Sequence, residues 1–401
     1  MPLTPDERSL ADLIGAAFSF NESAAPPPDL EGKDWPLMVE TATSHGIAPL
    51  AYAALKKSDL LKVAPRSAIE TLRLNYLRAS VANRLAFQDL SYWVDRFRHE
   101  NIPVIVLKGG ALAVTVYDDI ALRPMGDLDL LIRPESVARA REVLIEEGYA
   151  EGYASLTGMA GRSAARFSVA QSFQRMGKRP SQIDIHWHAF TTPYYFERIP
   201  VEWFWERTTG FQAGHARALT FSPEAQLLHL SAHCMLHGYR RLIWSYDIAR
   251  LIRRCAGQID WDEIVRASET FGLSQLLSKS LLEVREHWGV RVPAPVYERL
   301  GAAHTPLKGR VVFGASEAVS GGPLELINGL GLIGARRKMA YWKSIVFPSA
   351  SYMRGRFQIR NRAFVLPWYL WRAGRAVFLM SRAGLSISRE AILSRLFRRA
   401  T

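Results

Sequence analysis

Two short apolar runs, with glycines and acids at their ends, constrain the fold of this chain more than any other feature. Residues 104–134 read VIVLKGGALAVTVYDDIALRPMGDLDLLIRP, so that VIVL ends at Lys108, Gly109 and Gly110, and DLDLLI begins at Asp127. Apolar runs of this length, bounded by turn residues, are typical of buried strands. The chain is therefore predicted to form a sheet in which a glycine turn and two acids lie at strand ends.

The acids and the glycines of this stretch suggest a particular chemistry. Asp127 and Asp129 are two residues apart, so in a strand their carboxylates share one face. Neighbouring carboxylates repel each other unless a cation lies between them, and carboxylate oxygens suit Mg²⁺. Gly109 and Gly110 lack a Cβ, so their backbone N–H groups could approach a phosphate closely. The alternative is a strand-entry turn, where Asp is common because it bonds the local backbone.

A third acid follows in the run QIDIHW at residues 182–187. Its alternation places Asp184 on the polar face of a strand, where it could be a third metal ligand or the base that activates an acceptor hydroxyl. His186 and His188 share that face and have the spacing of a zinc pair, but the interpretation as ordinary polar-face residues is favoured. The segment 167–173 is expected to pair antiparallel with this strand.

Several cationic and histidine side chains could accompany the acids. Lys108 as a point charge and Arg123 as a bidentate fork could bind triphosphate oxygens, or they could pair with the acids. Asp247 is interpreted as a hydrogen-bond anchor. Three histidines, His229, His233 and His237, recur every four residues on one predicted helix face. They resemble a metal-binding ladder, but no carboxylate within a turn completes the set. This face is instead expected to line the cleft, with His233 and Arg240 or Arg241 near phosphate.

The periodicity along the chain predicts an α+β fold, with a small mixed sheet, flanking helices, and mostly helical regions before and after it. Helical spacing dominates the first hundred residues, and Glu135 to Glu147 suits a crossover helix with Gly148 as its stop. Gly321–Pro323 is expected to separate the last two regions. The predicted regions are a helical 1–100, a sheet-containing core at 101–220, a helical 221–320, and a basic, aromatic 321–401.

Cysteine content and charge bear on the compartment and the partners. Cys234 and Cys255 form neither a disulfide framework nor a zinc knuckle, and the first residues lack the features of a signal peptide, so a reducing cytoplasm is expected. Residues 336–401 contain 15 Lys or Arg and one acid, whereas the whole chain has a net charge of +13. This basic, aromatic segment is predicted to contact an anionic membrane or another polyanion, without a transmembrane helix. A solvated helical tail is the alternative.

These motifs resemble a known family. LKGGAL, Tyr117, RPM at 123–125, DLDLL from Asp127 and DIHW from Asp184 are similar to the uncharacterised nucleotidyltransferases of the polymerase-beta-like nucleotidyltransferase superfamily. The stretch HLSAHCMLHGYRRLIWSYDIARLI at 229–252 adds to the resemblance. Two features depart from the usual superfamily pattern, since Gly109-Gly110 stands in place of Gly-Ser and sixteen residues separate Gly110 from Asp127.

The resemblance implies a nucleotidyltransferase with Asp127, Asp129 and Asp184 as its catalytic and metal-binding acids. In that superfamily two Mg²⁺ ions bridge the acids and a nucleoside triphosphate, here expected to be ATP. An acceptor hydroxyl then attacks the α-phosphorus and pyrophosphate leaves. Lys108, Gly109, Gly110, Arg123 and His233 are the expected nucleotide-binding residues. These positions are what the resemblance and the residue chemistry imply together.

The expected function is transfer of a nucleoside monophosphate from a nucleoside triphosphate to a hydroxyl on a small molecule, sugar, peptide or protein. The alternative is a protein that binds nucleotide without turnover and docks on a membrane or partner through its basic segment. An enzyme that extends RNA 3′ ends ranks lower, because no RNA-binding module is evident.

Overall fold

A computed structural model of the 401-residue chain describes most of it. The described residues are 3–18, 28–152, 167–177, 181–304, 306, 309–310, 312–313, 329, 331–350, 353–354, 357–359, 365–375 and 377–378. The predicted linker at Gly321–Pro323 and the end of the basic segment after residue 378 lie outside them.

A mixed seven-stranded sheet forms the centre of the described part of the chain, in the order β3-β4-β5-β2-β1-β7-β6. The two apolar runs predict its inner strands β1 and β2, and the alternating segment QIDIHW predicts β5, which pairs antiparallel with β4 as expected. β1 runs antiparallel to β2 and parallel to β7, while β2 runs parallel to β5. The strands are β1 (Val104–Val106), β2 (Leu128–Ile132), β3 (Ala150–Glu151), β4 (Ala170–Arg175), β5 (Ser181–His186), β6 (Thr208–Ala213) and β7 (Ala216–Phe221). The α+β class predicted from the sequence is confirmed.

The two faces of the sheet pack against different helices. Val106, Leu130 and Ile185 belong to one buried cluster, which α4 (Arg66–His99) and α6 (Val137–Glu146) complete. Ile105 and Leu131 point the other way, into a larger cluster shared with the N-terminal helices and with the helices that follow the sheet. Because side chains alternate along a strand, Asp129 projects toward this second group of helices.

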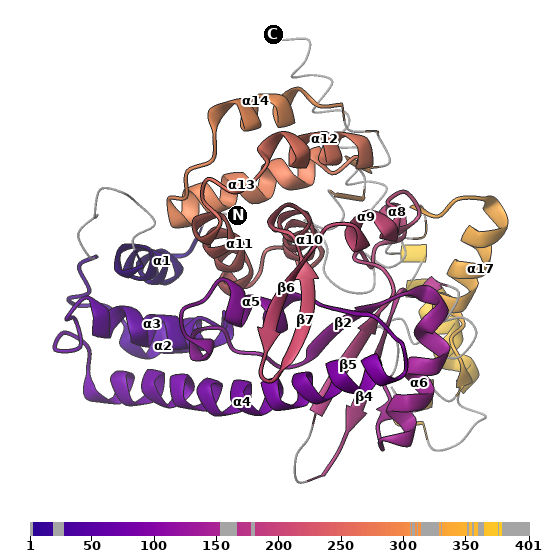
Figure 1. The fold of residues 1–401 in the computed structure, drawn as a ribbon, viewed down its shortest axis with the longest axis horizontal. Coiled ribbons are helices and arrows are strands. Elements are labelled where there is room, and N and C mark those ends of the chain that lie inside the picture. The colour runs from indigo at the N-terminus through magenta and orange to yellow at the C-terminus, as the bar shows by residue number, and fades with distance from the viewer. Residues whose placement is uncertain are drawn as a thin grey trace.

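The N-terminal helices α2 (Trp35–Ser44) and α3 (Ala48–Lys57) pack along α4, which runs along one border of the molecule, and α1 (Pro5–Ala17) packs on α2 and α3 (Figure 1). Thr4 and Glu7 form a capping box at the first helix, because each side chain accepts from the other residue's backbone N–H. The helical start of the chain is as the periodicity predicts.

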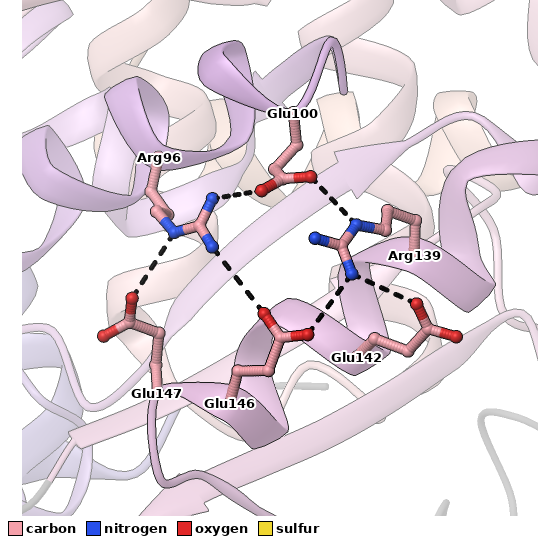
Figure 2. Close-up of polar contacts among 6 residues, drawn as sticks. All are labelled: Arg96, Glu100, Arg139, Glu142, Glu146 and Glu147. Atoms are coloured by element: carbon pink, nitrogen blue, oxygen red, sulfur yellow. Dashed lines mark hydrogen bonds and ion pairs between the residues drawn. The ribbon is translucent and has the colours of Figure 1, made fainter.

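An ion-pair network ties the end of α4 to α6 beside the sheet (Figure 2). Glu100 binds Arg96 at 2.5 Å and Arg139 at 2.8 Å. Three further glutamates, in α6 and at its C-terminal end, bind the same two arginines; they are Glu142, Glu146 and Glu147. Hydrogen bonds from Arg139 and Arg96 lower the pKa of Glu100 to about 2. α6 is the predicted crossover helix, and Gly148 follows it with a φ of +80°. The network thus fixes α6 against the long helix that borders the molecule.

Helices return after the sheet, as the sequence predicts from Ser222 onward. Ser222 caps α10 with Pro223 in its first turn, and Asp260 accepts from Glu263 N–H at the start of α12. The helices that follow β5 are α8 (Pro193–Phe196), α9 (Val201–Trp205), α10 (Pro223–Leu236), α11 (Leu242–Arg254), α12 (Trp261–Phe271), α13 (Ser274–Trp288), α14 (Ala294–Ala302) and α17 (Ala335–Val346). α10 packs on β7 and on α11, so it lies over the sheet face that carries Asp129.

Two parts of the fold differ from the sequence-based expectation. The hairpin β6–β7 was not predicted, because TTGFQA lacks a regular apolar alternation and its burial depends on α4 and on α5 (Lys108–Thr115). The predicted strand at 167–173 begins later, at Ala170, since Ser168 caps the local backbone of Ala170 through its hydroxyl. Among the described helices, none is long and apolar enough to span a membrane.

Candidate active site

Three polar side chains from β2 and β5 lie together on the sheet face that α10 covers. Asp129 is directly opposite Asp184 in the parallel pairing of the two strands, and His186 is two residues further along β5. Ligand atoms of Asp129, Asp184 and His186 lie within 4.8 Å of one another. The predicted neighbouring acid, Asp184, is therefore beside the Asp-x-Asp motif. The buried apolar residues Ile183 and Ile185 fix this register, because they occupy the opposite face.

Lys108 completes this cluster. Its ammonium donates to Asp129 Oδ1 at 2.6 Å, and His186 Nε2 lies 2.8 Å from the same oxygen. The side chain of Asp129 is only 6% exposed. Burial opposes ionisation, but Lys108 and His186 more than offset it and hold the pKa of Asp129 below its ordinary value. Asp129 is thus a buried carboxylate whose charge is balanced within the protein.

Asp127 belongs to the same motif as Asp129, but its pKa is shifted in the opposite direction. It precedes β2 at the edge of the cluster, and it has no hydrogen bond or ion pair within the described residues. Burial and repulsion from Asp129 and Asp184 raise the pKa of Asp127 to about 6. Two carboxylates that sit two residues apart therefore differ widely in pKa. An additional cation near Asp127 would relieve the repulsion.

The backbone bends sharply where β1 turns into α5. Lys108 has a φ of +48°, a left-handed conformation that is unfavourable for a residue with a Cβ. A hydrogen bond of 2.9 Å from Leu107 N–H to Asp129 C=O holds the preceding residue against β2. The bend directs the Lys108 ammonium to Asp129, and local strain of about 1 kcal/mol is the cost.

The two glycines have a packing role that the sequence did not reveal. They lie in the first turn of α5, not in a loop, and a Cβ on Gly110 would approach Val106 Cγ1 to 2.9 Å. A Cβ on Gly109 would lie 3.1 Å from Met125 Cγ and 3.4 Å from an Arg123 nitrogen. No side chain caps the N-terminus of this helix. The glycines allow α5 to start close to the strand and to the loop before Asp127.

Arg123 is bound to a buried acid rather than directed at the Asp-x-Asp motif. Its Nε donates to both carboxylate oxygens of Asp247 on α11, at 2.8 and 3.0 Å, and another guanidinium nitrogen donates to Pro124 C=O. The Tyr117 hydroxyl donates to Asp247 Oδ1 at 2.6 Å. Asp247 is 1% exposed, so its interpretation as an anchor is confirmed. The structure thus favours the predicted alternative in which Arg123 pairs with an acid.

Asn83 of α4 orders the long insert between Gly110 and Asp127. Its amide donates to the C=O groups of Ile120 and Arg123 at 2.5 and 2.8 Å, and its oxygen accepts from Met125 N–H at 3.1 Å. Asn83 is fully buried. The sixteen-residue separation, which differs from the usual superfamily pattern, is therefore a fixed part of the fold that leads directly into Asp127.

We expect a pronounced loss of stability when Arg123 is replaced by Ala, because Asp247 is then a buried carboxylate without its cation. The expected change is about 3 kcal/mol in the free energy of unfolding. Tyr117→Phe, which removes only one hydrogen bond to the same carboxylate, should cost about 1 kcal/mol. Urea denaturation of both variants measures the difference. If Arg123→Ala and Tyr117→Phe lower the free energy of unfolding equally, the ion pair does not contribute more than the hydrogen bond, and the prediction is wrong.

The histidines of α10 line the same space. Burial and the nearby Lys108 ammonium hold the pKa of His233 well below its ordinary value, and burial lowers the pKa of His229 to about 3. His229 Nδ1 bonds the C=O of Ala189 at 2.9 Å, while its buried Nε2 has no partner within the described residues. The rings of His233, His237 and Trp244 pack together with centroids 4.6 to 5.1 Å apart. These histidines are therefore held neutral beside the acids.

His186 is the main member of the cluster that the sequence analysis did not single out. The preferred interpretation treated it and His188 alike, as ordinary polar-face residues. The structure separates them, because His188 bonds Ile199 C=O and Phe190 N–H in the core while His186 contacts Asp129. The sequence feature that could have singled out His186 is its position two residues after Asp184 on the same strand face.

Comparison with known proteins identifies the family of this chain. The family model described as "uncharacterised nucleotidyltransferase" matches residues 31–289, which is more than half of the chain. The chain belongs to this family of nucleotidyltransferases. The enzyme class that the motifs predicted is thereby confirmed.

One solved structure has a low similarity to this chain. The nucleotidyltransferase shares 15% identity with a solved structure, an antigenic nucleotidyltransferase-like protein from Paracoccidioides brasiliensis. That match covers 57% of this chain and 96% of the other, with a TM-score of 0.35. No curated protein matches this chain.

Proposed function

We propose that the protein transfers a nucleoside monophosphate from a nucleoside triphosphate, ATP in the first instance, to a hydroxyl acceptor and releases pyrophosphate. The observation that carries this proposal is the in-register pair Asp129 and Asp184, with Asp127 at the entrance of the same strand. Family membership supports the nucleotidyl transfer. The acceptor that bears the hydroxyl belongs to one of four classes: a small molecule, a sugar, a peptide or a protein.

The donor set fits divalent cations. Asp129 and Asp184 supply oxygen ligands, as Mg²⁺ prefers, and His186 adds a nitrogen within 4.8 Å of them. Asp127, whose pKa is raised by burial and by repulsion from Asp129 and Asp184, is the fourth group that a cation would satisfy. When bound, two Mg²⁺ ions would neutralise charge on the triphosphate and its transition state. Asp127, Asp129 and Asp184 are the proposed ligands, with His186 beside them.

The other residues have proposed roles that follow from their positions. Lys108 can exchange Asp129 for a phosphate oxygen. It is the first residue of α5, which no side chain caps, and the backbone N–H groups of Gly109 and Gly110 in the same turn also favour an anion. Asp184 is exposed enough to accept the proton of an acceptor hydroxyl. In the transfer, the hydroxyl oxygen bonds to the α-phosphorus and the bond from that phosphorus to the pyrophosphate oxygen breaks.

The junction of α10 and α11 is the proposed far wall of the nucleotide site. Arg241 lies against Trp244, and no acid is paired with it within the described residues. A Cβ on Gly46 would come within 2.5 Å of the Arg241 guanidinium, so the glycine provides the room for this side chain. His233 stays neutral and can accept or donate one hydrogen bond to the nucleotide. Arg123 contributes by holding the insert, through Asp247.

The proposal is tested by incubating the protein with labelled nucleoside triphosphates, Mg²⁺ and a cell extract, and by measuring label transfer and pyrophosphate release. We expect Asp127→Asn to reduce transfer by about 10³-fold or more. Asp118→Asn is the matched control, since this carboxylate is 67% exposed and pairs with Arg250 outside the acid cluster. Equal transfer by the wild type and Asp127→Asn would refute the catalytic assignment. Nucleotide binding without transfer to any acceptor would favour the non-catalytic alternative.

A second proposed property concerns the basic segment. Within the helical stretch 365–375, Leu366, Leu370 and Trp371 are 65%, 67% and 48% exposed, and Arg375 stacks on Trp371. Exposed apolar side chains in a segment with 15 basic residues and one acid suit the surface of an anionic membrane. The protein would then be cytoplasmic and peripheral to the inner face of the membrane.

Liposome pelleting is expected to show binding to vesicles that contain anionic lipid and little binding to neutral vesicles. Added salt should weaken the binding, because charge attraction is screened. Leu366→Ser with Leu370→Ser should weaken it further, whereas Met176→Ser, at an exposed position outside the basic segment, should not. Binding that ignores both lipid charge and salt would contradict the proposal.

A further inference from the structure

His45 joins the end of α2 to the start of α11. The Leu242 N–H donates to its ring nitrogen Nδ1 at 3.2 Å, and the Ile243 N–H donates to its backbone C=O at 3.3 Å. Leu242 is the first residue of α11, and the residue before it, Arg241, provides no side-chain cap. Because the first amides of a helix have no acceptor within the helix, His45 supplies from another helix the cap that α11 lacks.

Glu7 of α1 fixes the form of the His45 ring. A carboxylate oxygen of Glu7 lies 3.1 Å from His45 Nε2, and the side chains of His45 and Glu7 are 17% and 16% exposed. Since Nδ1 accepts from Leu242, the neutral ring carries its proton on Nε2 and donates it to Glu7. Burial lowers the pKa of His45, although Glu7 opposes this shift, so the ring is neutral at pH 7. The Glu7 carboxylate thus selects the tautomer that can cap α11.

The start of α11 also carries a cation without an acid. Arg241 lies against Trp244, with 5.6 Å between its guanidinium carbon and the ring centroid. Burial and the nearby Arg123 lower the pKa of Arg241, and no carboxylate forms an ion pair with it in the part of the chain that the structure describes. Burial, Lys108 and Arg241 together lower the pKa of the His237 ring to about 4, so Arg241 and the acid cluster border the same space. A cation in this position favours an anion such as a triphosphate.

We infer that Glu7 and His45 are positioning residues for the proposed nucleotidyl transfer, because they hold the first turn of α11, and with it Arg241 and Trp244, in the arrangement that binds the nucleoside triphosphate. This inference rests on the proposed function, since it assigns a role within the same site. Neither residue belongs to the acid cluster, and Glu7 precedes residue 31, where the match to the family model begins. The N-terminal helix α1 is thereby coupled to the nucleotide-binding end of α11.

Hydrogen exchange of the full chain tests the contact itself. We expect His45→Ala to accelerate exchange of the Leu242 amide by about fivefold or more, the factor that corresponds to the loss of one helix cap. His45→Asn should exchange like the wild type, because the Asn Oδ1 takes the place of Nδ1 and accepts from the same N–H. His45→Gln should exchange like His45→Ala, because the longer amide reaches the place of Nε2 and not that of Nδ1. His215→Ala is the matched control, since this histidine also contacts an acid, Asp95 at 3.3 Å, but is 73% exposed.

Nucleotide binding tests the role of the contact in the site. Titration calorimetry with ATP and Mg²⁺ is expected to give a Kd that His45→Ala and His45→Gln each raise about fivefold or more, because a smaller fraction of the protein has an ordered α11 start. His45→Asn and His215→Ala should stay within about twofold of the wild-type Kd. In label transfer, KM should follow Kd while kcat changes by less than about twofold, since His45 touches no reacting atom. Circular dichroism at the assay temperature shows that each variant is folded.

Two results would overturn the inference. One is a folded His45→Ala variant that binds ATP as tightly as the wild type, and the other is a His45→Asn variant that exchanges and binds no better than His45→Gln. Binding of ATP by the wild type without transfer to any acceptor would refute the proposed activity instead, and the comparison of Kd values would still decide the role of His45. A wild type that binds no nucleotide would overturn both, while the exchange rates would still report the contact between His45 and α11.

Discussion

Replacement of Asp129 by Asn is expected to abolish nucleotidyl transfer and to lower the free energy of unfolding by about 3 kcal/mol. The carboxylate is 6% exposed and balances the Lys108 ammonium at 2.6 Å. Asn cannot carry the negative charge, so the variant leaves a mostly buried ammonium whose nearest remaining acids are Asp127 and Asp184. The stability loss is measured by urea denaturation with EDTA present, and the activity by label transfer.

The control for this prediction is Asp118→Asn, the same change at a carboxylate that is 67% exposed. Its free energy of unfolding should change by less than about 1 kcal/mol, and its transfer activity should remain. A double variant, Lys108→Met with Asp129→Asn, should recover part of the lost stability, because it removes both charges. If the double variant is as unstable as Asp129→Asn alone, the ion pair is not the cause of the loss.

Replacement of Asp127 by Asn is expected to have the opposite effect on stability. Burial and the two neighbouring carboxylates raise its pKa to about 6, so at pH 7 its ionisation opposes folding. Without divalent cations, Asp127→Asn should therefore stabilise the protein by about 2 kcal/mol at pH 7. Two acids of one motif would thus give stability changes of opposite sign, although we propose that both are required for transfer.

The pH dependence of this gain follows from the direction of the shift. A carboxyl with a raised pKa in the folded state destabilises that state above the folded pKa, and the penalty shrinks as protonation proceeds below pH 6. The advantage of Asp127→Asn over the wild type should accordingly fall between pH 6 and about pH 4 and then disappear. Chemical denaturation of both proteins at several pH values in EDTA measures this difference. An advantage that stays constant with pH would rule out ionisation as its cause.

Divalent cations provide a second measurement on the same pair of proteins. Mg²⁺ should raise the melting temperature of the wild type at pH 7, because it binds the folded acid cluster and not the unfolded chain. The shift should be much smaller in Asp127→Asn, so that added Mg²⁺ reduces or reverses the variant's advantage. An identical Mg²⁺ effect on both proteins would place the cation away from Asp127.

The local sequence pattern was sufficient to predict the inner strands of the sheet. β1 and β2 are short apolar runs between turn residues, and β5 alternates polar and apolar residues. The alternation in β2 and β5 alone assigns Asp129 and Asp184 to a polar face. The hairpin β6–β7 was missed because Thr208, Thr209 and Gly210 give no such pattern. Its place in the sheet comes from β1, α4 and α5, which are distant in sequence.

The partners of the charged residues could not be predicted in the same way. Arg123 lies shortly before the Asp-x-Asp motif, yet it bonds an acid 124 residues away. Lys108, by contrast, does pair with an acid of the motif. Both side chains are long and several carboxylates are within their potential reach, so only tertiary packing selects the partner. The widely different pKa values of Asp127 and Asp129 follow from that selection.

The parallel register of β2 and β5 has a consequence for how the protein can vary. Asp129 and Asp184 face each other only while Leu130 remains opposite Ile185, and a shift by one residue would turn one acid away from the other. The apolar residues that alternate with the acids in β2 and β5 thus keep the two carboxylates in register, in addition to forming part of the core. A substitution among them that leaves the protein folded could still misplace a carboxylate, so loss of activity need not be accompanied by loss of fold.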